Sequence, residues 1–170
     1  MREDPARTAT LEAQMTSKAD FTDEEWTRIK RAPFVAGMAI SLADPGGPIE
    51  AVKETTATLK AVLAAEGGEH GEVAQAIAQE ARAHHNPLGG FKPTKGANAG
   101  VEILAEIRAA SATVGEKASA EEATAFRAWM LAVAQDAADA AKEGGFMGFH
   151  AERVSAGEED MLERLRAVLS

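Results

Sequence analysis

Acidic residues stand beside two glycine-rich breaks in the chain. Seven of them are Asp44, Glu50, Glu54, Asp136, Asp139, Glu143 and Glu158. Hard cations such as Ca²⁺ or Mg²⁺ require several carboxylate or carbonyl oxygens in one place. Asp136, Asp139 and Glu143 follow the spacing i, i+3 and i+7, so they share one face of a helix. These seven residues are the candidate ligands of a divalent cation, either Ca²⁺ or Mg²⁺.

Two other interpretations of these acids stay open. The chain carries 27 Asp and Glu residues and a net charge of −9, and charge runs are usually solvated helix faces. Alternatively, Asp136 or Asp139 works with a histidine as the acid and base of an enzyme, which requires split pKa values inside a cleft. The spacing of the acids does not match an EF-hand loop. A non-enzymatic role is our leading expectation.

The histidines do not form a recognisable metal motif. His84 and His85 are adjacent, so on a helix their side chains diverge by about 100°. No His-Glu-x-x-His pattern occurs. We expect these histidines to lie at the surface near helix ends.

An apolar cluster follows the second glycine break. Gly-Gly-Phe occurs at 89–91 and again at 144–146, where it continues into Met147-Gly148-Phe149. Phe146, Met147 and Phe149 are the candidate lining of an apolar ligand site or a self-association patch. The alternative is a helix C-cap, with Gly144 just past the helix end and Phe146 as the accompanying apolar contact.

Several kinds of chemistry are excluded. The chain has no cysteine, so thiolate metal sites, disulfides and cysteine nucleophiles are absent. It lacks a Gly-x-Ser-x-Gly elbow and a Walker motif. An acidic chain is a poor partner for nucleic acid, and no apolar run approaches the roughly 20 residues of a membrane span. We expect a cytoplasmic protein with a protein partner or self-association.

The elements that must position these residues are helices. Capping boxes, in which a Ser or Thr is followed three residues later by Glu, open apolar-periodic runs at Thr22, Ser119 and Ser155. We expect seven helices in one domain over residues 21–170, after a disordered tail over residues 1–20 in which Met15 is an alternative start. Separate helices are expected on either side of Pro33. A seam of large residues for pairing with another helix comprises Ile49, Val52, Thr56, Leu59 and Leu63.

A helical hairpin occurs twice, over residues 33–64 and 120–169. Each copy is an apolar helix, a glycine-rich break and a second helix that ends in Ala-Val-Leu. A repeated hairpin leaves an apolar face that the other copy can bury. The sequence therefore predicts an all-α bundle with approximate internal two-fold symmetry.

One family resemblance follows from these hairpins. The segment from Val133 to Gly145, together with Val154-Ser-Ala-Gly-Glu-Glu-Asp-Met-Leu162, resembles the TerB-like tellurite-resistance proteins. By this resemblance, the acids of the first family motif correspond to Asp44 with Glu50 or Glu54. The acids of the second motif correspond to Glu143 and Glu158. The chain departs from the motif by lacking a Ser cap in the first copy and by having Glu-Gly-Gly in the second. The resemblance implies a cation-binding, stress-related accessory protein.

Overall fold

The computed structural model describes residues 15–44, 48–83, 86–142 and 154–170, and every regular element in these ranges is helical. The α-helices are α1 (Asp23–Ala43), α2 (Pro48–Ala64), α3 (Glu72–Ala83), α4 (Ala99–Lys117), α5 (Ala120–Lys142) and α6 (Ala156–Leu169). Two short 3₁₀ turns, η2 (Lys18–Asp20) and η3 (Ala65–Gly67), precede α1 and follow α2. The all-α prediction is confirmed.

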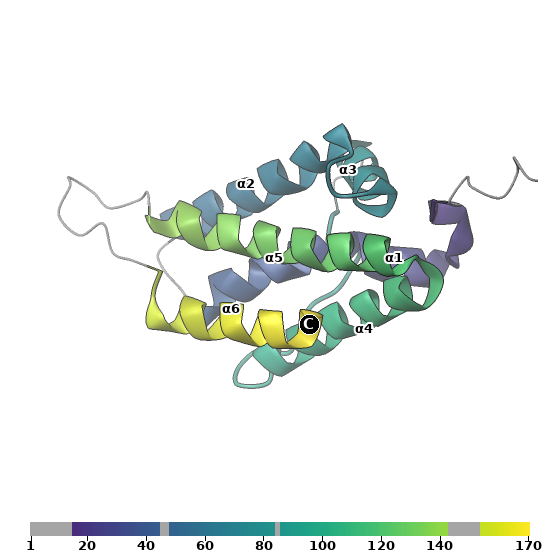
Figure 1. Cartoon of the computed structure of the whole chain (residues 1–170). Coiled ribbons are helices and arrows are strands. Elements are labelled where there is room, and N and C mark those ends of the chain that lie inside the picture. The colour runs from purple at the N-terminus through teal and green to yellow at the C-terminus, as the bar shows by residue number, and fades with distance from the viewer. Residues whose placement is uncertain (1–14, 45–47, 84–85, 143–153) are drawn as a thin grey trace, which may run out of the picture.

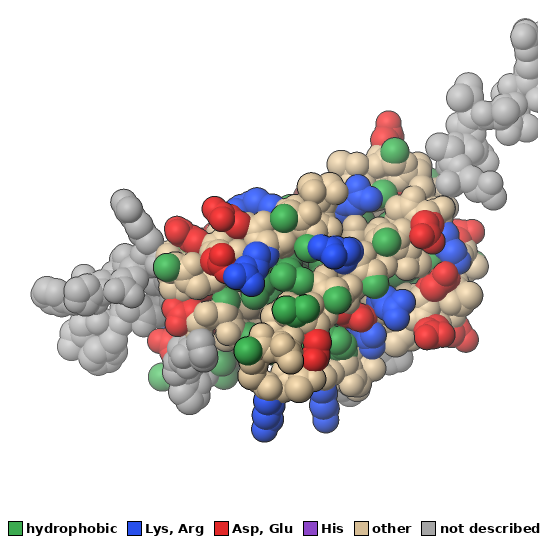
Figure 2. Space-filling view, turned by 90° about the horizontal axis from the view of Figure 1, so that it is seen from below, with side chains coloured by type: hydrophobic (Ala, Val, Ile, Leu, Met, Phe, Trp, Pro, Cys, Tyr) green, Lys and Arg blue, Asp and Glu red, His purple; other side chains and the backbone are tan. Residues whose placement is uncertain are grey.

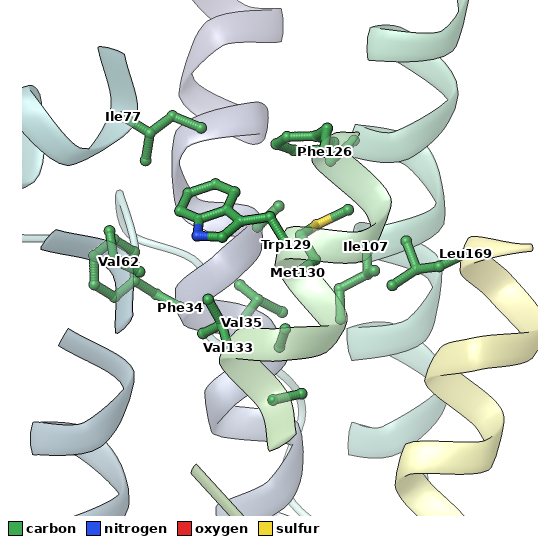
Figure 3. Packing of buried hydrophobic residues seen from close by; sticks show 14 of the residues in the cluster. Phe34, Val35, Val62, Ile77, Ile107, Phe126, Trp129, Met130, Val133 and Leu169 are labelled. Carbon is green, nitrogen blue, oxygen red and sulfur yellow. The ribbon is translucent and has the colours of Figure 1, made fainter. Parts of the chain in front are cut away.

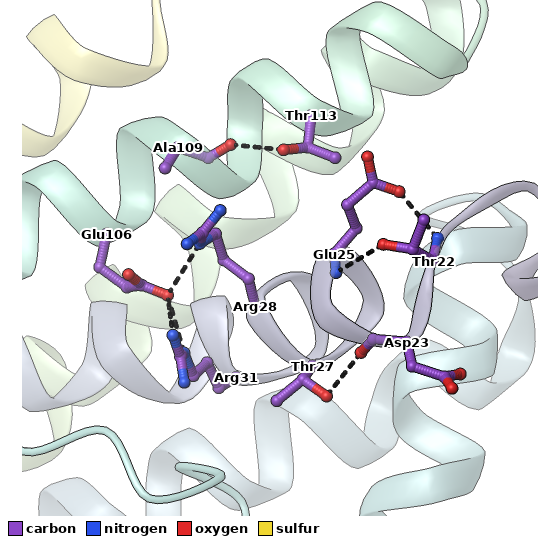
Figure 4. A network of polar contacts seen from close by, with 9 residues as sticks. All are labelled: Thr22, Asp23, Glu25, Thr27, Arg28, Arg31, Glu106, Ala109 and Thr113. Carbon is purple, nitrogen blue, oxygen red and sulfur yellow. Dashed lines mark hydrogen bonds and ion pairs between the residues drawn. The ribbon is translucent and has the colours of Figure 1, made fainter.

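The three predicted capping boxes are present. At the start of α1 the amide of Glu25 donates to the Thr22 hydroxyl, and the Glu25 carboxylate accepts from the amide of Thr22 (Figure 4). Ser119 and Glu122 make the same pair of hydrogen bonds before α5. Each box satisfies two amide groups that a helix start otherwise leaves without partners.

Helix α1 is one helix where the sequence predicted two, so the described residues hold six α-helices instead of the expected seven. Pro33 lies inside α1, where it donates no amide hydrogen bond. Pro33 is nevertheless buried, as are Ile29 and Phe34 of the same helix, which are 0% and 8% exposed. Packing of this face outweighs the local preference of proline for a helix start.

Two long helices form the centre of the bundle (Figure 1). Helices α1 and α5 pack on each other, with α2 and α3 on one side and α4 and α6 on the other. Buried side chains from all six helices meet around Trp129, which is 1% exposed (Figure 3). The Arg31 guanidinium ties α1 to α4, since its Nε lies 2.7 Å from Glu106 Oε1 (Figure 4).

The apolar seam predicted for α2 faces outward. Ile49, Val52 and Leu59 are 71%, 64% and 42% exposed. The buried face of α2 consists of Glu54, Thr58 and Val62, and it packs mainly on α5. Most of the predicted pairing seam is therefore exposed to solvent in this chain. The spacing of apolar residues in the sequence predicts an apolar stripe on a helix, but it does not show which face of that helix the bundle buries.

Small residues explain how the polar face of α2 reaches the interior. A Cβ added at Gly37 of α1 would lie 2.2 Å from the Thr58 hydroxyl oxygen. The Thr58 side chain of α2 therefore packs directly against the backbone of α1. The Thr58 hydroxyl donates to the carbonyl of Glu54, 2.8 Å away, which satisfies the buried hydroxyl within α2. Because α1 and α2 approach closely, α2 buries the face with the smaller side chains, which includes Thr58, and exposes the face with Ile49, Val52 and Leu59.

The described chain begins inside the predicted tail. Thr16 is buried, and its amide and hydroxyl both donate to the carboxylate of Glu122, at 2.8 and 3.0 Å. Lys18 forms an ion pair with Glu80 on α3. Residues 15–20 are therefore docked on the bundle, and residues 1–14 lie outside the described part of the chain.

Both predicted hairpins correspond to helix pairs in contact, α1 with α2 and α5 with α6. No helix in the described ranges is both long enough and apolar enough to cross a bilayer.

Candidate functional site

Four of the seven predicted acids gather where α1 ends, α2 begins and α6 begins. Asp44 follows the last residue of α1, Glu50 and Glu54 lie in the first two turns of α2, and Glu158 lies in the first turn of α6. The negative charges of Asp44, Glu50 and Glu158 all act on the carboxyl of Glu54. We call these four residues the acidic corner.

Close packing of helix ends holds the acidic corner together. A Cβ at Gly157 would lie 2.5 Å from the carbonyl oxygen of Ala43, so the first turn of α6 rests on the last turn of α1. The Ser155–Glu158 capping box fixes this turn, since the Ser155 amide donates to Glu158 Oε2 at 2.8 Å. The sequence placed Glu158 in a different copy of the repeat from Asp44, and the fold brings them together.

Glu54 is the unusual member of the acidic corner. Its side chain is 2% exposed, and its Oε2 has no hydrogen-bond partner among the described residues. Burial raises the pKa of Glu54, and the charges of Glu158, Glu50 and Asp44 raise it further, while a hydrogen bond from the Ser41 hydroxyl lowers it. The carboxyl therefore takes up a proton, or attracts a cation, more readily than an ordinary glutamate.

The acidic corner is not a formed metal centre. Among the described residues, no group of three or more His, Asp or Glu side chains is arranged to hold a metal ion as it stands. Glu158 already accepts a hydrogen bond in its capping box, and Asp44 is exposed. A cation at this corner would require the carboxylates to move toward Glu54.

Two of the remaining predicted acids, Asp136 and Asp139, lie on α5, outside the acidic corner. Asp136 and Asp139 are exposed on α5, and Gln135 donates to Asp139 at 3.2 Å. Although the residue as a whole is exposed, partial desolvation of its carboxyl raises the pKa of Asp136, and the charge of Asp139 adds to this effect. Glu143 lies outside the described residues, as do Phe146, Met147 and Phe149.

The structure offers no histidine for the acid–base alternative within its described ranges. His70 stacks on the indole of Trp129, with 6.3 Å between ring centroids. Trp129 lies seven residues before Asp136 on α5, about 10 Å along the helix. His84, His85 and His150 lie outside the described residues.

An apolar groove of about 340 Å³ lies between α1 and α2. Its large apolar residues are Phe34 and Met38 of α1, Leu59 of α2, and Pro87 and Leu88 of the segment after α3. Three hydroxyl side chains, from Ser41, Thr55 and Thr58, also line it. The volume falls at the lower end of the range found for ligand pockets.

The groove continues into the exposed seam of α2. Leu59 belongs to both, and Val52 and Ile49 extend the apolar surface along α2 toward its first turn. Leu42, which is 46% exposed, lies one turn beyond Met38 on α1. We call the groove together with Leu42, Ile49 and Val52 the α1–α2 face.

Charges are mixed on the side of the molecule seen in Figure 2. Acidic and basic side chains are interspersed there, with small apolar areas between them. The net charge of −9 therefore does not gather into one acidic field on that side.

Sequence reasoning missed most of the α1–α2 face. Leu59 and Val52 were assigned to a seam for helix pairing, and Met38 and Leu88 were not connected with them. The alternation of three and four residues from Ile49 to Leu63 was the available signal. Its outward direction depends on the contact of Gly37 with Thr58, which the sequence alone does not reveal.

The chain matches no family model, no curated protein and no solved structure.

Proposed function

We propose that this chain is a non-enzymatic interaction protein and that the α1–α2 face is its binding surface. The observation that carries the proposal is the orientation of α2, which buries Glu54 and Thr58 and presents Ile49, Val52 and Leu59 to solvent. Large apolar side chains gathered on one exposed face commonly mark a binding surface.

The groove gives this surface a shape that a partner can enter. Phe34 is 8% exposed and forms part of the wall, while Leu59 is 42% exposed at the rim. Grooves that bind a helix of another protein commonly have apolar side chains both on their walls and at their rim, and these contact the side chains of that helix. No covalent or redox step is needed for this role.

A neutral alkyl probe tests whether the α1–α2 face binds apolar groups at all. Methyl-labelled protein is titrated with octyl glucoside below its critical micelle concentration and followed by NMR. We expect saturable shifts at Leu59 and Leu88. The Leu88 shift should be lost in Leu59→Gln and retained in Val101→Gln, which removes a more exposed apolar residue from α4, 65% exposed against 42% for Leu59. Shifts that do not saturate, or that survive Leu59→Gln, would remove the proposal.

The acidic corner favours a second candidate function, the binding of Ca²⁺ or Mg²⁺. Its support is the buried Glu54, whose Oε2 lacks a partner among the described residues and on which the charges of three further carboxylates act. Carboxylate oxygens are the ligands that both ions prefer. A bound ion would offset the repulsion that the four acids exert on one another.

Thermal unfolding with and without millimolar Ca²⁺ or Mg²⁺ tests this candidate. An ion bound only to the folded state must raise the melting temperature. We expect the increase to disappear in Glu54→Gln and to persist in Asp136→Asn, which removes an acid outside the corner. No increase in the unmodified protein would rule out cation binding.

The TerB-like resemblance is our proposed evolutionary context for both candidates. It accounts for acids beside both helical hairpins and favours a cytoplasmic, stress-related accessory role. Equivalence of the two hairpins belongs to the same proposal. An experimental structure in which the hairpins over residues 33–64 and 120–169 fail to superpose would remove it.

A further inference from the structure

The α1–α2 face extends further than a small molecule requires. The seam from Ile49 to Leu63 covers fifteen residues of α2, and its two ends lie about 21 Å apart along the axis. The groove beside it holds only about 340 Å³. A small apolar ligand would fill the groove and leave Ile49 and Val52 uncovered. An elongated apolar partner, such as a helix, covers both.

Two basic side chains lie beside the seam beyond Glu50, the acid next to Ile49 at the start of α2. Lys53 and Lys60 lie one turn after Ile49 and Thr56, so they form a row along one edge of the seam. Neither lysine forms an ion pair with a described residue. On a chain with a net charge of −9, this row offers two basic side chains to a partner.

A second copy of the chain fits this surface poorly. Antiparallel pairing of α2 with itself about the middle of the seam would set Lys53 near Lys60 of the second copy, which brings like charges together along one edge of the pair. The net charge of −9 on each copy opposes the same association. The occupant must instead carry acidic groups where α2 carries lysine.

We infer that the α1–α2 face binds an amphipathic helix of a partner protein, with acidic residues along one edge of its apolar seam. The apolar side chains of that helix enter between Phe34, Met38 and Leu59, in the manner of helix-in-groove recognition. Its acidic edge lies along Lys53 and Lys60. The inference rests on the proposed function and adds the chemistry of the partner.

Two helical peptides with one shared leucine seam test the inference. One carries Glu and the other Lys at the positions that flank the seam, and fluorescence anisotropy measures the binding of each. We expect the Glu peptide to bind about fivefold more tightly, since two exposed ion pairs contribute about 0.5 kcal/mol each. The net charge of the chain alone would favour the Lys peptide, so the two explanations predict opposite orders.

Charge reversal at the site supplies the decisive variant. Lys53→Glu with Lys60→Glu should reverse the order of the two peptides. Arg108→Glu with Arg166→Glu makes the same change in net charge at exposed positions on α4 and α6 and should leave the order unchanged. Equal binding of both peptides, or equal effects of the two double variants, would overturn the inference.

Two further outcomes separate the inference from the proposed function. Saturable binding of octyl glucoside without any peptide preference would remove the acidic helix and leave the binding surface in place. A dimer in sedimentation that Val52→Glu dissociates would identify a second copy as the occupant and would also overturn the inference.

Discussion

Glu54 is buried in a place where its charge destabilises the fold. Its Oε2 lacks a partner among the described residues, and Asp44, Glu50 and Glu158 add negative charge around it. A buried acceptor without a partner costs about 1–3 kcal/mol. Residues that a fold retains at such a cost are often functional, which is why Glu54 carries the cation candidate.

Glu54→Gln is expected to stabilise the protein at neutral pH in the absence of divalent ions, by about 1 kcal/mol. Because burial raises the folded-state pKa of Glu54, the folded chain binds a proton more readily than the unfolded chain. The cost of the charge is therefore complete above the folded pKa and disappears as the pH falls toward the ordinary value. Urea unfolding at several pH values should show the variant and the unmodified protein converging in acid.

Glu80→Gln provides the opposite case. Burial acts to raise the pKa of Glu80, but hydrogen bonds from Lys18 and Trp26, and the charges of Lys18 and Lys30, overcome this and hold the pKa below its ordinary value. Glu80 therefore stabilises the fold above the ordinary pKa, and this stability is lost as the pH falls through the folded pKa. The same unfolding series should show a loss of about 1–2 kcal/mol at neutral pH. An equal sign for both variants would contradict our assignment.

The helix starts were the most predictable feature of the elements. The capping boxes at Thr22, Ser119 and Ser155 form as expected because their hydrogen bonds are local and join residues three apart. The continuation of α1 through Pro33 was not predictable in this way. It depends on the burial of Ile29 and Phe34 against other helices, which local preferences do not encode.

The orientation of α2 likewise depends on contacts between residues far apart in the sequence, whereas its apolar stripe is a local feature. Its apolar stripe was visible from Ile49 onward, but the face it buries is set by the contact between Gly37 and Thr58. Four members of the predicted cation site converge for a similar reason, because α6 packs on the end of α1. Asp136 and Asp139 share their helix face as predicted, yet the fold leaves both exposed.

Gly37→Ala tests the contact that orients α2. The added methyl group would lie 2.2 Å from the Thr58 hydroxyl oxygen, so α1 and α2 must separate. We expect a loss of about 1–3 kcal/mol, as for other overpacked positions. Thr58→Ala in the same chain should recover part of it. Chemical denaturation measures both variants.

Gly67→Ala is the matched control for this substitution. No heavy atom lies within 4 Å of a Cβ at Gly67, so we expect a change within about 0.5 kcal/mol. If Gly37→Ala were as harmless as Gly67→Ala, the close approach of α1 and α2 would be wrong.

At the scale of the whole molecule, hydrogen bonds between Thr16 and Glu122 join two parts of the chain that lie 106 residues apart in the sequence. Glu122 accepts from the amide and hydroxyl of Thr16, and also from the amide of Ser119 in the capping box of α5. Burial acts to raise the pKa of Glu122, but these hydrogen bonds hold it below its ordinary value. One carboxylate thus fixes both the docked N-terminal segment and the start of α5.

Glu122→Gln is expected to destabilise the protein by about 1–3 kcal/mol, because hydrogen bonds to a charged acceptor become weaker or are lost. Glu121→Gln changes an exposed neighbour in the same helical turn and should have little effect. Hydrogen exchange should also show faster exchange at the Thr16 amide in the first variant. Unchanged exchange at Thr16 would mean that residues 15–20 are held by other contacts.

The central claim is that α2 presents Val52 and Leu59 to solvent and buries Thr58 and Val62. Since the chain has no cysteine, single substitutions Val52→Cys and Val62→Cys can be compared by their rates of reaction with a maleimide at low protein concentration. We predict that the cysteine at position 52 reacts about as fast as in the unfolded chain, and that the cysteine at position 62 is strongly protected. Protection at position 52 together with rapid reaction at position 62 would contradict the account.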